Sequence, residues 1–247
     1  MNYQKILKQT SHRNYPLPKG KWAGIQDWKH LLFLHWPVYP TLLEPLLPEK
    51  LELDTFDDEA WISIVPFKVD KMHIRKLPPL PFLYPFSEVN LRTYVKKDGI
   101  PGVYFFSMDA ANFFAVTGAK TGGLPYFKAK TKLKKRGKTF YFKSIRKSEE
   151  KESFQVKYKP TGRLFYTEKG TIDYWLMERY ALWADKNNSL IRGDIHHKQW
   201  KIQHAEANLE IQTLTDSYLP NNAFISEPLA HYAKTKRVVI WPVKKVE

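Results

Sequence analysis

The stretch FSEVNLRTYV, residues 86–95, alternates in chemical character with the two-residue period of a β-strand. Successive side chains of a strand point to opposite faces, so four groups able to bind a ligand share one face. The four are Glu88, Asn90, Arg92 and Tyr94, and the opposite face holds Val89, Leu91, Thr93 and Val95. A carboxylate, an amide, a guanidinium and a phenol are unusual on a plain outer face, so we predict that this strand lines a ligand pocket. A half-exposed strand with a solvated polar face is the alternative that the pattern leaves open.

Strand patterns continue on both sides of this stretch. A short apolar run over residues 29–37 ends at a proline and indicates a buried strand. Further strands are expected over residues 60–69, 103–109, 128–134, 140–147, 153–159, 179–185, 189–195, 204–213 and 238–243. Short helices are expected over residues 39–47, 110–120, 171–178 and 227–234, and Asp109 is expected to cap the second of them. Many strands with few short helices predict a mainly β fold, an antiparallel barrel or sandwich.

Composition favours one intracellular domain. Of the 247 residues, 43% are hydrophobic and 15% are aromatic, which is enough for a substantial core. We predict a single domain over residues 29–247, preceded by an N-terminal arm, residues 1–28, that packs on it. The absence of cysteine excludes disulfides, thiolate metal sites and cysteine nucleophiles, and it suits a reducing cytoplasm. No signal-peptide or membrane-spanning pattern occurs, so we expect a cytoplasmic protein with no membrane partner.

A formal net charge of +15 raises the question of a polyanionic partner. Eight lysines alternate with other residues along three consecutive predicted strands and form one basic sheet face: Lys128, Lys130, Lys132, Lys134, Lys143, Lys147, Lys157 and Lys159. A nucleic-acid partner is disfavoured because recognition motifs and interleaved aromatic residues are missing. A binding module for a polyanion or a protein, acting through this lysine face, is the alternative function.

The histidines form no metal-binding motif. His196 and His197 are adjacent, so a strand would point them to opposite faces. We therefore expect neither a metal nor another cofactor. His35 lies inside the apolar run, where it either binds the ligand or is a hydrogen-bonded core residue.

Several segments together resemble the YqjF-like family of uncharacterised bacterial proteins, which is grouped with the acetoacetate decarboxylase superfamily. The segments are LLFLHWPV (31–38), LLPEKLELDTFD (46–57), SEVNLRTYV (87–95), PGVYFFSMDAAN (101–112), GLPYFKA (123–129), ERYALWA (178–184) and GDIHHKQW (193–200). The resemblance extends from about residue 28 to the end of the chain. It implies a cone-like antiparallel β-barrel of the acetoacetate decarboxylase type around one internal pocket.

Acetoacetate decarboxylases attack their keto acid with a lysine whose pKa is depressed by a neighbouring lysine. Their lysine pair lies in a Gly-x-Pro-Lys-Lys segment, which here reads GLPYF, residues 123–127. A phenol cannot form an imine, so the resemblance implies that this chain is not a Schiff-base decarboxylase. It also places a pocket glutamate at Glu88 and a pocket cation at Lys29, where the family has arginine.

We therefore predict a pocket that binds a small carbonyl- or carboxylate-bearing molecule. Glu88 is expected to be a general acid or base, or a hydrogen-bond anchor, with Tyr126 as the second catalytic group. The ligand-binding residues are expected to be Lys29, Asn90, Arg92, Tyr94 and His35. An internal ion pair between Glu88 and Arg92, with a purely structural role, is the alternative. Turnover of the ligand, by a lyase- or hydrolase-like reaction of a small organic acid, and assembly into a homo-oligomer are left open.

Overall fold

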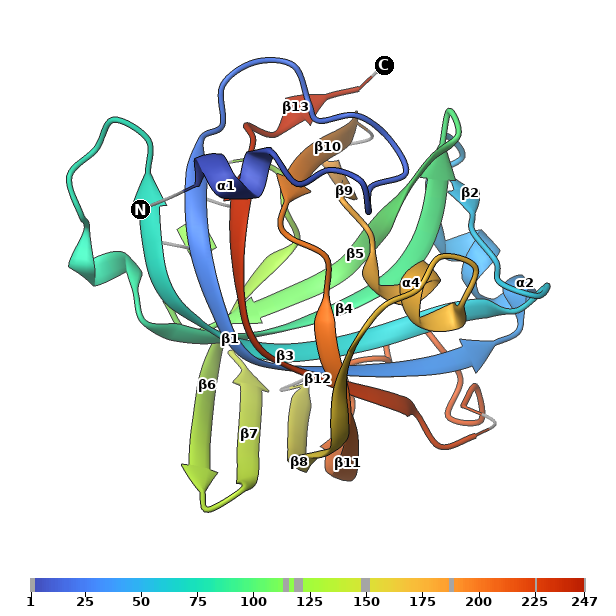
Figure 1. Ribbon diagram of the computed structural model, residues 1–247. Helices are drawn as coiled ribbons and strands as arrows, with labels where there is room; N and C mark the ends of the chain where they lie inside the picture. Colours follow the sequence, from blue (N-terminus) through green and yellow to red (C-terminus); the bar gives the residue numbers. More distant parts are fainter. Residues whose placement is uncertain are drawn as a thin grey trace.

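The computed structural model describes residues 3–112, 116–117, 122–147, 152–186, 189–224 and 226–246. These residues form one large sheet with a few short helices, so the predicted mainly β fold is confirmed (Figure 1). The strands are β1 (Gly24–Val38), β2 (Glu52–Leu53), β3 (Ala60–Ile74), β4 (Phe86–Lys97), β5 (Ile100–Ala110), β6 (Tyr126–Arg136), β7 (Thr139–Arg146), β8 (Ser153–Tyr166), β9 (Ala181–Lys186), β10 (Ser189–His196), β11 (Lys201–Gln212), β12 (Leu229–Ile240) and β13 (Lys244–Lys245). The helices are α1 (Gln4–Leu7), α2 (Pro40–Leu43) and α4 (Ile172–Met177), with 3₁₀ turns at Glu44–Leu46 and Pro81–Leu83.

The sheet closes on itself. Its strands follow the order β13-β10-β9-β5-β6-β7-β8-β11-β12-β1-β3-β4-β2, and β10 also pairs with β12 while β5 also pairs with β4. These extra pairings join β1, β3, β4, β5, β9, β10 and β12 into a ring, whose strands curve around one another in Figure 1. Neighbouring strands are antiparallel, except that β5 runs parallel to both β6 and β9. Gly102 permits the close pairing of β5 with β9, because a Cβ atom at this position would lie 2.6 Å from the Ala181 carbonyl oxygen.

Both faces of β4 are buried in apolar clusters. Val89 and Leu91 belong to a core that β4 shares with β1, β3, β7 and β8. On the opposite face, Tyr94 packs in a second core with Phe33 and Phe105. The alternation predicted for residues 86–95 is therefore confirmed, and the alternative of a solvated outer face is wrong for this strand.

Three local predictions differ from the structure. Residues 227–234 are not a helix, because β12 pairs with β1 along its length and also with β10 and β11. Residues 24–28, which we assigned to the arm, form the beginning of β1. Asp109 does not cap a helix: it lies in β5 and forms an ion pair with Arg146. The helix predicted over residues 110–120 falls largely outside the described residues.

The N-terminal segment packs on the ring through apolar contacts. Ile6 of α1 and Trp22 are buried against Val239 and Trp241, close to the end of β12. The His12 Nε2 group donates a hydrogen bond to the His197 carbonyl oxygen over 2.8 Å. None of the helices in the described ranges is long and apolar enough to cross a lipid bilayer.

Candidate functional site

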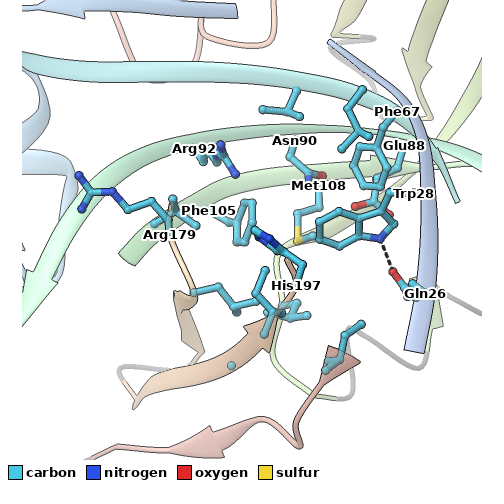
Figure 2. A pocket seen from close by; sticks show the side chains of 18 of the residues that line it. Gln26, Trp28, Phe67, Glu88, Asn90, Arg92, Phe105, Met108, Arg179 and His197 are labelled. Atoms are coloured by element: carbon cyan, nitrogen blue, oxygen red, sulfur yellow. Dashed lines mark hydrogen bonds between the residues drawn. The ribbon is translucent and has the colours of Figure 1, made fainter. Parts of the chain in front are cut away.

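A cavity of about 390 Å³ is lined by the strands of the ring. Figure 2 shows side chains from several of these strands converging on it. Most of the lining is apolar, and the larger apolar side chains include Trp28, Phe33, Phe105, Met108 and Trp200. A mainly apolar cavity of this size with a few polar groups is typical of a small-molecule site.

Strand β4 supplies a row of polar side chains to this cavity. Glu88, Asn90 and Arg92 all line it, as the two-residue alternation predicts. Their partners on β3 are Phe67, Val65 and Ser63, in unbroken register. The row therefore runs along one extended strand, with each polar residue one full strand period from the next.

Glu88 is the buried acid of the cavity, with only 2% of the residue exposed. The Tyr126 hydroxyl donates to its Oε2 atom over 3.0 Å, and the Asn90 amide nitrogen, in the orientation that satisfies its neighbours, lies 2.9 Å from Oε1. Burial raises the pKa of Glu88 to about 8, outweighing both hydrogen bonds, and the charge of Asp109 raises it further. Glu88 is therefore mostly protonated at neutral pH and can donate a hydrogen bond or a proton to a ligand.

Tyr126 lies beside Glu88 and stays neutral. Burial and the neighbouring carboxyl group of Glu88 raise the pKa of its phenol well above the ordinary value. The hydroxyl proton of Tyr126 is directed at Glu88 and orients that carboxyl group.

Two guanidinium groups line another part of the cavity. Arg92 and Arg179 both lie near the Tyr94 ring, with their Cζ atoms 5.9 and 5.2 Å from its centre. Arg179 is buried, its Nη1 atom lies 2.5 Å from Asp54 Oδ2, and its Nε group donates to the Trp175 carbonyl over 2.6 Å. The Nη2 atom of Arg179 and the Nε atom of Arg92 are buried without a hydrogen-bond partner.

Charge compensation around these arginines is incomplete. Asp54 forms an ion pair with Arg179, but its carboxylate also lies 2.6 Å from the Lys96 ammonium group. Within the part of the chain that the structure describes, Arg92 has no ion-pair partner, and in particular it forms no ion pair with Glu88. The alternative of a structural Glu88–Arg92 pair is therefore wrong. A buried donor without an acceptor is costly, so an anionic group at this position would satisfy the Nε–H of Arg92.

His197 adds a neutral imidazole to the cavity and points into it beside Phe105 in Figure 2. Burial lowers its pKa well below the ordinary value, with the charge of Lys236 as the next cause. Its Nδ1 atom lies 2.8 Å from the Lys198 carbonyl oxygen, so Nδ1 carries the proton and donates. The Nε2 atom is left as a hydrogen-bond acceptor.

Lys29, which we predicted to bind the ligand, lies outside the cavity lining. Its ammonium group pairs with Asp70 at 2.5 Å on a partly exposed surface. The reason is a slip in β1 at His30, which has φ = 54° and a shifted register with β3. Before the slip Trp28 lines the cavity and after it Phe33 does, so Lys29 points to the other side. We do not retain Lys29 as a ligand-binding residue.

His35 and Tyr94 are brought together, but behind the cavity rather than in its lining. The Tyr94 hydroxyl lies 3.0 Å from His35 Nδ1, and both contact the Ser63 hydroxyl, at 2.7 and 2.6 Å. All three residues are fully buried. His35 is therefore the hydrogen-bonded core residue of the two alternatives, and the Tyr94 ring, outside the lining, lies beside the guanidinium groups of Arg92 and Arg179.

The lysine face forms on β6, β7 and β8 as predicted, but part of it is neutralised. Lys157 pairs with Glu210 at 2.5 Å, and Lys159 pairs with Glu206 at 2.8 Å. Both glutamates belong to β11, which pairs with β8. These cross-strand ion pairs are typical of a solvated sheet face.

Neither a metal cluster nor a lysine nucleophile is found at the cavity in the ranges that the structure covers. Among these residues no group of three or more His, Cys, Asp or Glu side chains is placed to hold a metal ion. The described lining contains arginines as its only cations, with no lysine. The polar groups of the described lining can form hydrogen bonds, bind an anion and transfer a proton.

The closed, mainly β fold is an acetoacetate decarboxylase-like fold. It is similar to an acetoacetate decarboxylase-like enzyme from Sphingomonas wittichii RW1 (TM-score 0.64, 14% identity, 95% of this chain and 99% of that one). It is also similar to the enduracididine biosynthesis enzyme MppR complexed with pyruvate (TM-score 0.62, 10% identity, 95% and 93%).

The sequence narrows this class to one family. Residues 25–237 match the family described as "Uncharacterized conserved protein (COG2071)". The chain is 44% identical over 244 residues to the uncharacterized protein YqjF of Bacillus subtilis (strain 168), covering 97% of this chain and 99% of the relative. The chain therefore belongs to this family of uncharacterised conserved proteins, and the resemblance drawn from its segments is confirmed.

Arg179 and His197 are cavity residues that we did not predict. Arg179 follows α4 and His197 follows β10, so both lie in short connections that have no periodic pattern. The available signal was their place in ERYALWA and GDIHHKQW, two segments that carry the family resemblance.

Proposed function

We propose that the protein binds a small organic acid in this cavity, with the carboxylate held by Arg92 and Arg179. The observation that carries the proposal is the guanidinium of Arg92, which faces a mainly apolar cavity with a buried, unpartnered Nε atom and no counter-ion in the described structure. A carboxylate is the natural complement, because its two oxygens match the planar donors of arginine.

Glu88 supplies the second half of the proposed function. Its carboxyl group, protonated at neutral pH, donates to a carbonyl or hydroxyl oxygen of the ligand, and Asn90 and Tyr126 hold it in place. As a general acid it would polarise or protonate that oxygen without forming a covalent bond. The absence of cysteine supports a cytoplasmic location for this chemistry.

Thermal unfolding of the purified protein with keto, hydroxy and phenolic acids, each beside its carboxamide, tests the carboxylate site. A ligand that binds only the folded protein at a hundredfold excess over its dissociation constant adds about 2.7 kcal/mol to the free energy of unfolding. We expect acids, but not amides, to raise the melting temperature of the wild type and of the control Lys29→Met. Arg92→Met should abolish the increase. An equal increase in Arg92→Met would overturn the proposal.

A further inference from the structure

We infer that the ligand is an elongated acid, with its carboxylate at the two arginines, an apolar body, and a second oxygen at Glu88. The inference rests on the proposed function and adds the distance between the two polar ends. Glu88 and Arg92 are four residues apart on β4, which is extended and in unbroken register with β3. At about 3.3 Å per residue, their backbone positions are separated by about 13 Å.

The side chains of Glu88 and Arg92 form no ion pair across this gap. The guanidinium of Arg92 lies 5.8 Å from the Phe33 ring and 5.9 Å from the ring of Tyr94, a residue still farther from Glu88 along β4. Arg179 lies on the same Tyr94 ring, so the cationic end is fixed away from Glu88. The carboxyl group of Glu88 is held in turn by Asn90 and Tyr126.

Between the two ends the strand carries Asn90, which contacts Glu88, and the facing lining is mainly apolar apart from His197. The lining contributed by neighbouring strands includes Val65, Phe105 and Met108, and Trp200 closes another side. A short 2-keto acid carries its carboxylate and its keto group on adjacent carbons, so it cannot reach both ends at once. An acid with a chain or ring between its carboxylate and its second oxygen reaches both and covers this apolar wall.

Calorimetric titration with a graded series of acids tests the inference. The probes are pyruvate, 3-hydroxypropanoate, 6-hydroxyhexanoate and 8-hydroxyoctanoate, with octanoate as the analogue that lacks the second oxygen. Each added methylene group that becomes buried should tighten binding about fourfold, so the longer hydroxy acids should bind far more tightly than pyruvate.

Two variants test the two ends of the ligand separately. Arg92→Met should weaken binding of every acid, whereas Glu88→Gln should weaken the hydroxy acids and leave octanoate almost unchanged. If Glu88→Gln does not fold, Tyr126→Phe, which loosens the same carboxyl group, replaces it. Lys29→Met is the matched surface control and should bind like the wild type.

The possible outcomes distinguish the elongated shape of the ligand, inferred in this subsection, from the proposed binding of a small organic acid. Arg92-dependent binding of pyruvate that is as tight as that of the longer acids would overturn the inference and leave the proposed function standing. Binding that does not depend on Arg92, or no binding of any acid, would overturn both.

Discussion

Glu88 illustrates at the scale of one residue how the fold sets chemistry. The same carboxyl group in water would be ionised at neutral pH, but here burial outweighs two hydrogen bonds and raises its pKa to about 8. The neutral acid costs less to bury than a carboxylate, and it can give a proton to a ligand. Arg92 is the opposite case, because its guanidinium lines the cavity with a buried Nε donor that has no hydrogen-bond partner.

The raised pKa of Glu88 predicts a pH dependence of stability. Between the unfolded pKa, near 4.5, and the folded pKa of about 8, the folded state holds a proton that the unfolded state has released. Stability from this group is therefore complete below the unfolded pKa and is lost as the pH rises towards 8, by about 1.4 kcal/mol per pH unit.

Urea unfolding of the wild type and Glu88→Gln across pH 5 to 9 measures this effect. Glutamine has no proton to lose, so the variant should gain stability relative to the wild type as the pH rises to about 8 and hold the difference above it. A difference between the two proteins that is constant with pH would show that Glu88 ionises normally.

At the scale of elements, a buried ion cluster fastens β7 to β5. The Nε and Nη2 groups of Arg146 donate to the Asp109 carboxylate over 2.9 to 3.2 Å, and its Nη1 group donates to Glu152. Arg146 and Asp109 are almost fully buried, and the Arg146 guanidinium lies 4.0 Å from the Phe127 ring centre. The cluster thus ties the end of β5 to the β6–β7 hairpin beside Glu88.

Arg146→Met should destabilise the protein by about 3–5 kcal/mol, because it leaves the Asp109 carboxylate buried without its cation. The control is Lys159→Met, which removes an exposed pair with Glu206 and should cost less than about 1 kcal/mol. Chemical denaturation measures both changes. Equal effects of the two substitutions would contradict the structural role of the buried cluster.

The elements also show what sequence can and cannot predict. The face of β4 that lines the cavity follows from alternation alone, because that strand keeps its register with β3 from Glu88 to Arg92. The face of β1 does not, because the left-handed residue His30 exchanges the two sides and removes Lys29 from the cavity. Residues 227–234 are predicted to be a helix, but the pairing of β12 with strands distant in sequence overrides their local pattern.

At the scale of the whole molecule, the ring is closed by the two strand pairings that have the fewest paired residues. β10 meets β12 at two residue pairs, Ile195–Ile240 and His196–Val239. β9 meets β5 at three pairs, whereas β1 pairs with β3 and β12 along most of its length. The cavity is lined in part by β9 and β10, so the part of the ring joined through the fewest residue pairs also borders the proposed site.

Hydrogen exchange should follow this arrangement. We call the short β10–β12 and β5–β9 pairings the seam of the ring. Amides of β9 and β10 should exchange faster than those of β1 and β3, because local opening of the seam breaks few cross-strand bonds. A bound acid should slow exchange in β9 and β10 most. Mass spectrometry of exchanged peptides measures this, and uniform protection around the ring would contradict the proposed seam.

The most direct test of the central claim is the side-chain Nε–H signal of Arg92 in ¹⁵N NMR spectra, identified by its absence in Arg92→Met. With 8-hydroxyoctanoate added, we predict that this signal shifts with saturation, because the guanidinium gains a carboxylate partner, and that it does not shift with 1,8-octanediol. Saturable binding of the acid that leaves the Arg92 signal unmoved would contradict the account.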